Sequence, residues 1–216
     1  MNRYKILSKY SNRGSLFIIA APSGAGKTSL VNSLLKRDPR LVLSISHTTR
    51  PARPGEIDGR HYHFVSETAY EHMVDNGDFM EHARVFDHYY GTNRNSVALQ
   101  LETGHDVILE IDWQGARQVR FAFPDCCLIF IIPPSLETLR ERLTGRGQDN
   151  ADVIQRRMRD AQAEISHWAE FDQLVVNDDF DTALEELLAI INDHRTQQPH
   201  QVNKDYQLLA QRLGKS

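Results

Sequence analysis

The sequence has little cysteine, no long apolar run and no strong excess of either charge. Its two cysteines, Cys126 and Cys127, are adjacent inside an apolar run, so they offer no framework for a structural disulfide or a metal site. We expect both to be buried in a strand. No apolar run approaches the ~20 residues of a membrane span, and the N-terminal MNRYKILSKYSNRG is not followed by the apolar segment of a secretion signal. We therefore expect a cytoplasmic protein with no membrane partner.

The formal net charge is only -4, so the molecule has no overall field that would attract nucleic acid. We expect no nucleic-acid partner, and any basic residues that bind phosphate must act in local clusters. Hydrophobic residues make up 40% and charged residues 25%, which is typical of a globular protein. With 216 residues the chain is long enough for one substantial core with insertions, and no internal repeat is present.

The clearest motif is the stretch SLFIIAAPSGAGKTSL at residues 15–30. An apolar strand, a glycine-rich turn and the start of a helix follow one another, and such a turn points backbone N–H groups at a bound phosphate. Lys27 is placed to reach the β- and γ-phosphates of a nucleoside triphosphate, and the Thr28 hydroxyl can ligate Mg²⁺, as in a P-loop. The usual first glycine is replaced by Ala21. The alternative interpretation is a tight glycine turn with an incidental lysine.

Strand and helix patterns alternate along the rest of the chain, which predicts an α/β fold with a P-loop NTPase-type parallel sheet flanked by helices. A small α+β insertion and a helical lid interrupt this alternation. Within the insertion, Ser66 can cap a short helix. The expected strands cover residues 16–20, 41–46, 79–86, 88–92, 106–112, 126–132 and 173–178. The expected parts are a core with the P-loop (1–44), an insertion (45–95), core (96–136), a lid (137–166), and core with a C-terminal helical tail (167–216).

The strand DVILEID at residues 106–112 is typical of a Walker B strand, because it carries Glu110 and Asp112 to its carboxyl end. Asp112 is therefore a candidate for the Mg²⁺ site. The alternative is that Asp112 only caps the helix that follows.

The predicted lid contains six arginines and is divided in the middle by Gly145 and Gly147. Two helices joined by a flexible basic elbow can close over a bound nucleotide. The alternative is a solvated charged face, in which Glu137, Glu141 and Asp160 pair with some of these arginines.

The insertion has the residues expected of an acceptor site for a phosphomonoester. Arg50 and Arg53, three apart in a proline-rich segment, can present guanidinium groups to one phosphate, and Tyr62 and Tyr90 can add hydroxyl donors. Glu81 suits the paired N–H donors of guanine. Ser46 and Thr92 could complete the recognition, although any one such Tyr or Ser alone is more often a packing or turn residue.

Seven segments in order resemble guanylate kinase, over about residues 15 to 190: SHTTRPARPGEIDGRHYHF, FMEHARVF, YYGT, ILEIDWQGA, FIIPPS, GRGQD and VVNDDFD. The resemblance implies transfer of the γ-phosphoryl group of ATP to GMP, giving ADP and GDP, on a kinase of core, GMP-binding insertion and lid. It also implies Mg²⁺ as cofactor, and ATP and GMP as the small-molecule partners. No covalent enzyme intermediate is needed, because an acceptor phosphate oxygen is already a nucleophile.

Carried over position by position, the resemblance assigns four groups of residues. The expected GMP contacts are Ser46, Arg50, Arg53, Tyr62, Glu81, Tyr90, Gly91, Thr92 and Glu110, where some relatives have Asp at the last position. The expected ATP contacts are Ala21, Pro22, Ser23, Gly24, Ala25, Gly26, Lys27, Thr28, Ser29 and Asn177. The expected catalytic residues are Lys27, Arg50, Arg142, Arg146 and Arg157. The expected Mg²⁺ ligands are Thr28 and Asp112.

Two alternatives remain at this point: a catalytically silent guanylate-kinase-like module that binds other proteins, and a kinase for another nucleoside monophosphate. The intact Lys27, Arg50 and lid favour a kinase, since a scaffold has no need of them. A homo-oligomer, dimer or higher, is left open, and the tail beyond Thr196 has helical leucine spacing without recognisable chemistry.

Overall fold

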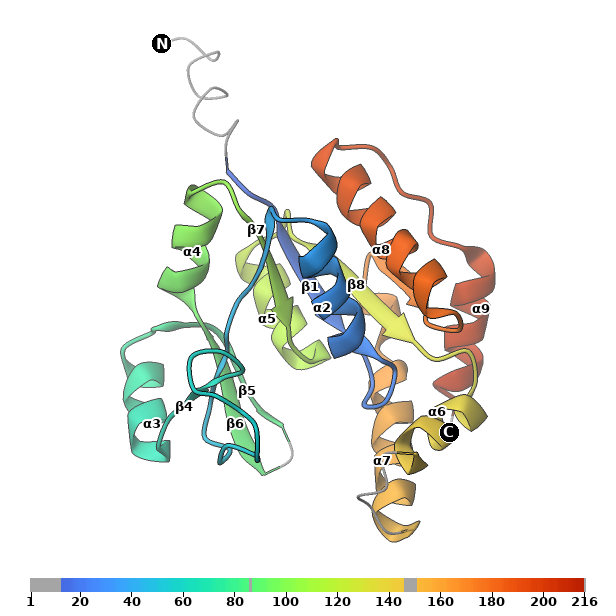
Figure 1. The fold of residues 1–216 in the computed structure, drawn as a ribbon, viewed down its shortest axis with the longest axis horizontal. Coiled ribbons are helices and arrows are strands. Elements are labelled where there is room, and N and C mark those ends of the chain that lie inside the picture. Colours follow the sequence, from blue (N-terminus) through green and yellow to red (C-terminus); the bar gives the residue numbers. More distant parts are fainter. Residues whose placement is uncertain (1–12, 86, 146–150, 216) are drawn as a thin grey trace. The chain divides into compact units, whose positions relative to one another are not determined.

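The computed structural model describes residues 13–85, 87–145 and 151–215, and the chain divides into two compact units. Unit 1 comprises the described parts of Met1–Leu16, Pro39–Leu109 and Gln114–Cys126. Unit 2 comprises the described parts of Phe17–Asp38, Glu110–Trp113 and Cys127–Ser216. Figure 1 shows the ribbon of the chain, coloured from blue at the N-terminus to red at the C-terminus.

Unit 2 is built on three parallel strands in the order β1-β8-β9. Strand β1 (Leu16–Ala20) pairs with β8 (Cys127–Ile132), and β8 pairs with β9 (Gln173–Val176). Every residue of β1 and β8 is buried, as expected for near-continuous apolar strands of a parallel sheet. The predicted parallel α/β sheet is therefore confirmed for these strands, although β9 ends two residues before the predicted Asp178.

Five α-helices belong to the described part of unit 2: α2 (Lys27–Arg37), α6 (Leu136–Thr144), α7 (Ala151–Ile165), α8 (Phe180–Arg195) and α9 (Lys204–Leu213), with a 3-10 turn at Trp168–Glu170. Ser135, Asp179 and Asn203 cap three of them, because each side chain accepts a hydrogen bond from a first-turn amide. Helices α2 and α8 pack together and are joined by an ion pair between Asp38 and Arg195. The tail that showed only helical spacing in the sequence thus contains α9.

Helices α6 and α7 pack on each other through a small apolar cluster of Leu139, Leu143, Met158 and Ala161. All four side chains are buried. These helices lie at the position of the predicted lid, and the elbow residues 146–150 lie outside the described part of the chain.

Unit 1 contains the parallel pair β2 (Leu41–Leu43) and β7 (Asp106–Glu110). Both strands are shorter than predicted. The predicted strand 41–46 ends at Leu43, since the Ser46 carbonyl accepts from the His63 amide at 2.9 Å and so turns toward another set of strands. The predicted strand 106–112 ends at Glu110 because helix α5 (Trp113–Ala122) begins three residues later.

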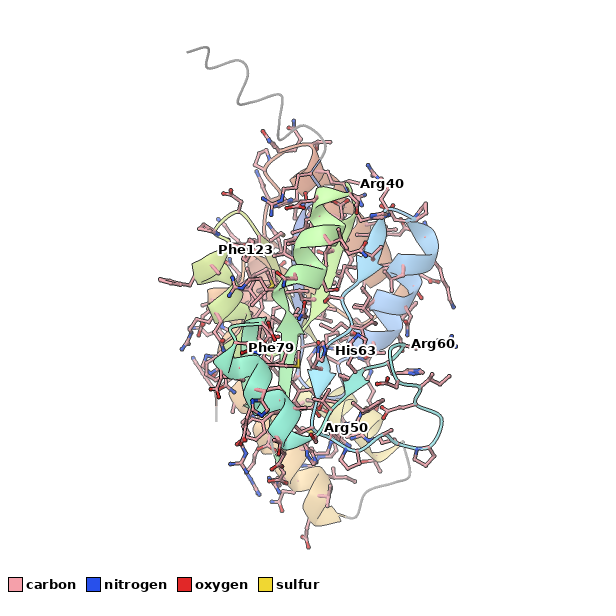
Figure 2. The ribbon with its side chains drawn as sticks, turned by 90° about the vertical axis from the view of Figure 1, so that its left-hand side faces the viewer. Arg40, Arg50, Arg60, His63, Phe79 and Phe123 are labelled. Carbon is pink, nitrogen blue, oxygen red and sulfur yellow. The ribbon has the colours of Figure 1, made fainter. Side chains whose placement is uncertain are left out.

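The predicted insertion forms a four-stranded sheet in unit 1 with the order β4-β3-β6-β5. Its strands are β3 (His47–Thr48), β4 (His63–Phe64), β5 (Phe79–Val85) and β6 (His88–Asn93). Helices α3 (Glu67–Asp75) and α4 (Arg94–Glu102) pack against this sheet, and the predicted cap at Ser66 is confirmed. Figure 2 labels Arg50, His63 and Phe79 in this part of unit 1.

Both cysteines are buried, with 4% of each residue exposed. Cys127 begins β8 and Cys126 immediately precedes it, so the predicted burial is confirmed while the predicted strand starts one residue late. Among the described helices, none is long and apolar enough to cross a membrane.

Candidate active site

The glycine-rich loop of unit 2 connects the end of β1 to the start of α2, as predicted. Gly24 and Gly26 both have φ near 93°, a left-handed conformation that favours glycine. Gly26 is the N-cap residue of α2 and provides no side-chain hydrogen bond to the first turn. The first amides of this helix are therefore available to an anionic ligand, and the helix dipole favours negative charge at this end.

Asn177 packs directly against the loop. Its Nδ2 atom donates a 2.7 Å hydrogen bond to the Ala25 carbonyl, and the side chain is buried. A Cβ atom added at Gly26 would lie only 2.3 Å from the same Nδ2 atom. Position 26 therefore needs glycine for two reasons, its φ angle and its contact with Asn177. The structure brings the predicted residue Asn177 to the phosphate loop.

Of the three predicted lid arginines, Arg157 contacts this loop and Arg142 contacts Asn177 beside it. Arg142 on α6 donates from Nη2 to the Asn177 carbonyl at 2.9 Å, and Arg157 on α7 donates from Nη2 to the Ser23 hydroxyl at 2.7 Å. Of the predicted ion pairs on these helices, an exposed one between Arg156 and Asp160 is present at 3.9 Å. The third arginine, Arg146, lies outside the described residues.

Charged groups on three segments of unit 2 interact around the loop. Burial raises the pKa of the Glu164 carboxyl on α7 to about 7, and Asp112 and Asp160 also raise it. Lys27 and the backbone amide of Ser23, which hydrogen-bonds to this carboxylate, act in the opposite direction. Lys27, Asp112 and Glu164 are therefore close enough for their charges to interact. Sequence reasoning missed Glu164, whose only signal was its place seven residues after Arg157, on the same helix face.

The loop offers hard oxygen atoms to a divalent cation. The described residues include no group of three His, Cys, Asp or Glu side chains that could hold a metal by themselves. Mg²⁺ is commonly held by one or two protein oxygen ligands together with phosphates and water. The Thr28 hydroxyl, at the start of α2, and the Asp112 carboxylate fit that chemistry.

Unit 1 holds the residues predicted for the acceptor, except Glu110. Among them, the Arg50 side chain is held by several contacts. Its side chain is 9% exposed, and its Nη2 atom forms a 2.7 Å ion pair with Glu56 Oε1. The guanidinium group also lies 5.3 Å from the centre of the Tyr62 ring, within cation–π range. The hydrogen bond to Glu56 is the main reason that the pKa of Arg50 is raised. Sequence reasoning missed Glu56, although it follows Arg53 by three residues in the same proline-rich segment.

The two predicted tyrosines lie together beside Arg50. The Tyr62 and Tyr90 rings meet edge to face, with their centres 5.9 Å apart, and the Arg50 side chain hydrogen-bonds to Tyr90. Tyr70, on α3, donates a 2.7 Å hydrogen bond to the Tyr90 carbonyl and so fixes this strand. The Arg53 side chain is exposed, while its backbone amide donates to Glu56 Oε2 at 2.7 Å.

Glu81 and Thr92 lie opposite each other on the paired strands β5 and β6. The Thr92 hydroxyl donates to Glu81 Oε1 at 2.6 Å, and both residues are buried. Gly91, next to Thr92, lies against Phe79, because a Cβ atom there would be 2.9 Å from the ring. The half-buried Ser46 precedes β3 in the same unit.

Glu110 ends β7 and belongs to unit 2, apart from the other predicted acceptor residues. Its Oε1 atom is buried and has no hydrogen-bond partner among the described residues. Such an oxygen is costly to bury unpaired, so a ligand or water that satisfies it is expected.

Comparison with known proteins identifies the family of this chain. The model of the family "Guanylate kinase" matches residues 13–194. The chain belongs to the guanylate kinase family. It is 56% identical to the guanylate kinase of Alkalilimnicola ehrlichii over 93% of this chain and 97% of that protein. It is 58% identical to the guanylate kinase of Nitrosococcus oceani, over 93% and 98% of the two chains.

A solved guanylate kinase has the same fold. The crystal structure of guanylate kinase from Anaplasma phagocytophilum matches with a TM-score of 0.72 and 31% identity. The match covers 96% of this chain and 100% of that one. The α/β, P-loop NTPase-type fold predicted from the sequence is thereby confirmed for this guanylate kinase family member.

Proposed function

We propose that this chain carries out the reaction of its family, transfer of the γ-phosphoryl group of ATP to GMP, with the residues of the two clusters described above. The observation that best supports the acceptor assignment is Arg50. A buried guanidinium group held by Glu56 beside two tyrosine side chains suits a phosphate monoester. The family match supports the choice of GMP.

The phosphate loop would bind ATP. Backbone amides at the start of α2 would contact the phosphates, Lys27 would neutralise the β- and γ-phosphates, and the first turn of α2 would contribute its dipole. Arg157 contacts this loop and Arg142 contacts Asn177 beside it, and we assign both to the charge that develops during transfer. Asn177 holds the loop through its hydrogen bond to the Ala25 carbonyl, and we assign it a position near the adenine of ATP.

Separate residues would bind the phosphate and the guanine base of GMP. Arg50, Arg53, Tyr62, Tyr90 and Ser46 would bind the phosphate, where planar guanidinium forks match its oxygens. The Glu81 carboxylate would accept from the two N–H donors on one edge of guanine, and Thr92 holds Glu81 in place. Gly91 and Glu110 complete the proposed acceptor contacts.

Mg²⁺ would be held by Thr28 and Asp112, whose oxygens suit a hard cation. When bound, the ion offsets the negative charge of the phosphates during transfer. The protein groups would bring the GMP phosphate and the γ-phosphate of ATP within bonding distance against their mutual repulsion. They would also hold the attacking oxygen in line with the bond that breaks. No protein nucleophile takes part, because a GMP phosphate oxygen attacks the γ-phosphorus directly.

A coupled assay for ADP release, run with each monophosphate in turn, tests this proposal. We expect activity with GMP and Mg·ATP, and little with AMP, dTMP or UMP. Equal activity with AMP would show that Glu81 does not select guanine and would favour a broader monophosphate kinase. No ADP release with any acceptor would favour the silent interaction module. The proposed location is the cytoplasm, where both nucleotides are made and used.

A further inference from the structure

Glu164 is a polar residue of the nucleotide cluster to which the proposed mechanism gives no role. It lies on α7 seven residues after Arg157, and two helical turns bring both side chains to one face. Its carboxylate accepts a hydrogen bond from the backbone amide of Ser23, while its Oε2 atom is buried and has no hydrogen-bond partner in the described part of the chain. A long side chain is thus buried against the first half of the phosphate loop.

Ser23 is held at two points by the same helix. Arg157 binds its hydroxyl at 2.7 Å, and Glu164 binds its backbone amide. The next residue, Gly24, lies against α6, because a Cβ atom there would be 3.0 Å from both Leu139 Cδ1 and Leu143 Cδ2. The segment Ser23–Gly24 therefore rests on the α6–α7 pair through hydrogen bonds and close packing.

We propose that Glu164 is a positioning residue for the phosphate loop, which fixes the Ser23 amide and so aims the amides that follow it at the phosphates of ATP. This inference rests on the proposed assignment of the loop to ATP. The role needs a hydrogen-bond acceptor rather than a negative charge. Burial supports this, because it disfavours the charged form of the Glu164 carboxyl.

We expect that nucleotide binding breaks one of the two contacts on Ser23 and leaves the other in place. Arg157 is a proposed ligand of the transferring phosphate, so its bond to the Ser23 hydroxyl would be exchanged for phosphate oxygens. Glu164 has no positive charge with which to bind a phosphate, so its hydrogen bond to the Ser23 amide is not exchanged in this way. It is therefore suited to hold the loop both before and after nucleotide binding.

The test compares Glu164→Ala with Glu164→Gln, and uses the exposed Asp152→Ala on the same helix as a control. Binding of a non-hydrolysable ATP analogue is measured by calorimetry without GMP, and KM is measured separately for ATP and GMP. Loss of a buried hydrogen bond leaves the Ser23 amide unpaired, so we expect the alanine variant to bind ATP about tenfold more weakly. The GMP KM should stay within about twofold.

Glutamine keeps a carbonyl oxygen that can accept from the Ser23 amide, so it should retain ATP affinity within about threefold of wild type. The proposal is overturned if the glutamine variant binds ATP as weakly as the alanine variant, since charge would then be the important property. It is also overturned if the alanine variant binds like wild type, or if it loses GMP and ATP to the same extent.

Amide hydrogen exchange of the nucleotide-free wild-type protein gives a test that needs no folded variant. The Ser23 amide should exchange slowly, because it is hydrogen-bonded and covered by α7. Exchange as fast as an exposed loop amide would contradict the proposal. A wild-type protein that binds the ATP analogue but fails to phosphorylate GMP would refute the proposed function while leaving these measurements on Glu164 intact.

Discussion

Asn177 Nδ2 donates a 2.7 Å hydrogen bond to the carbonyl oxygen of Ala25, and thereby joins the residue after β9 to the middle of the phosphate loop. The same side chain fills the space in which any residue larger than glycine at position 26 would place its Cβ atom. Asn177 therefore shapes the loop as well as lying near the proposed ATP site.

Asn177→Ala should weaken ATP binding and lower stability. The Ala25 carbonyl would lose its buried donor, which costs about 1–3 kcal/mol. We expect the ATP KM to rise by about tenfold, with the GMP KM unchanged. Chemical denaturation and steady-state kinetics measure the two effects, and an unchanged ATP KM would remove Asn177 from the proposed site.

Lys27→Ala should abolish most of the activity. The lysine is proposed to offset charge on the transferring phosphate, and by analogy with other transition-state cations its loss should lower kcat by on the order of a thousandfold. The coupled ADP assay measures this. Activity within about tenfold of wild type, a barrier change of only ~1.4 kcal/mol, would contradict the assignment of this loop.

Arg50→Ala should raise the GMP KM by about a hundredfold, because hydrogen bonds to a charged group contribute about 1.5–3 kcal/mol each. It should leave binding of an ATP analogue unchanged. Arg60→Ala is a matched control, since Arg60 is exposed in the same segment of unit 1. Equal effects of the two substitutions would mean that only the general positive charge of this segment matters.

Glu81→Gln should weaken GMP selectively. A carboxamide can accept only one of the two guanine donors, and its own N–H group would face the other. The Thr92 hydroxyl can still donate to the carboxamide oxygen, so the fold should be retained. GMP KM is the deciding measurement, and an unchanged value would exclude Glu81 as the guanine ligand.

Stability should depend on pH through Glu164. Its pKa is about 7 in the folded protein and near the ordinary 4.5 when unfolded. Between these values the folded state holds a proton that the unfolded state has released, so the free energy of unfolding should fall as pH rises from about 4.5 to 7. The change should be up to about 3 kcal/mol. Urea denaturation of Glu164→Gln should lack this part of the pH dependence, and identical profiles for both proteins would show that the carboxyl group is not buried.

Local motifs accounted for much of what the sequence predicted correctly. The P-loop lies within one short segment, so its strand, turn and helix followed from consecutive residues. The pairing of β5 with β6 could be predicted because two short strand patterns follow each other with a turn between them. Ser66 was recognisable as a helix cap from its position before an amphipathic segment.

Contacts between distant segments could not be predicted in this way. Nothing in the sequence near Ser23 indicates that Glu164 accepts its amide, since that contact depends on how α7 packs in unit 2. The early end of β2 has a similar cause, because the Ser46 carbonyl bonds to His63 rather than continuing the strand. Glu56 was missed for a different reason: a carboxylate was not expected among residues that bind an anion.

The two buried thiols at the start of β8 have a practical consequence for labelling. Cys126 and Cys127 are each only 4% exposed, so thiol reagents should reach them slowly in the folded protein. A cysteine introduced at an exposed position, such as Phe121 on α5, should then react first without removal of the native pair. Fluorophores or spin labels could be attached one site at a time to an otherwise unaltered sequence, to follow movements during turnover.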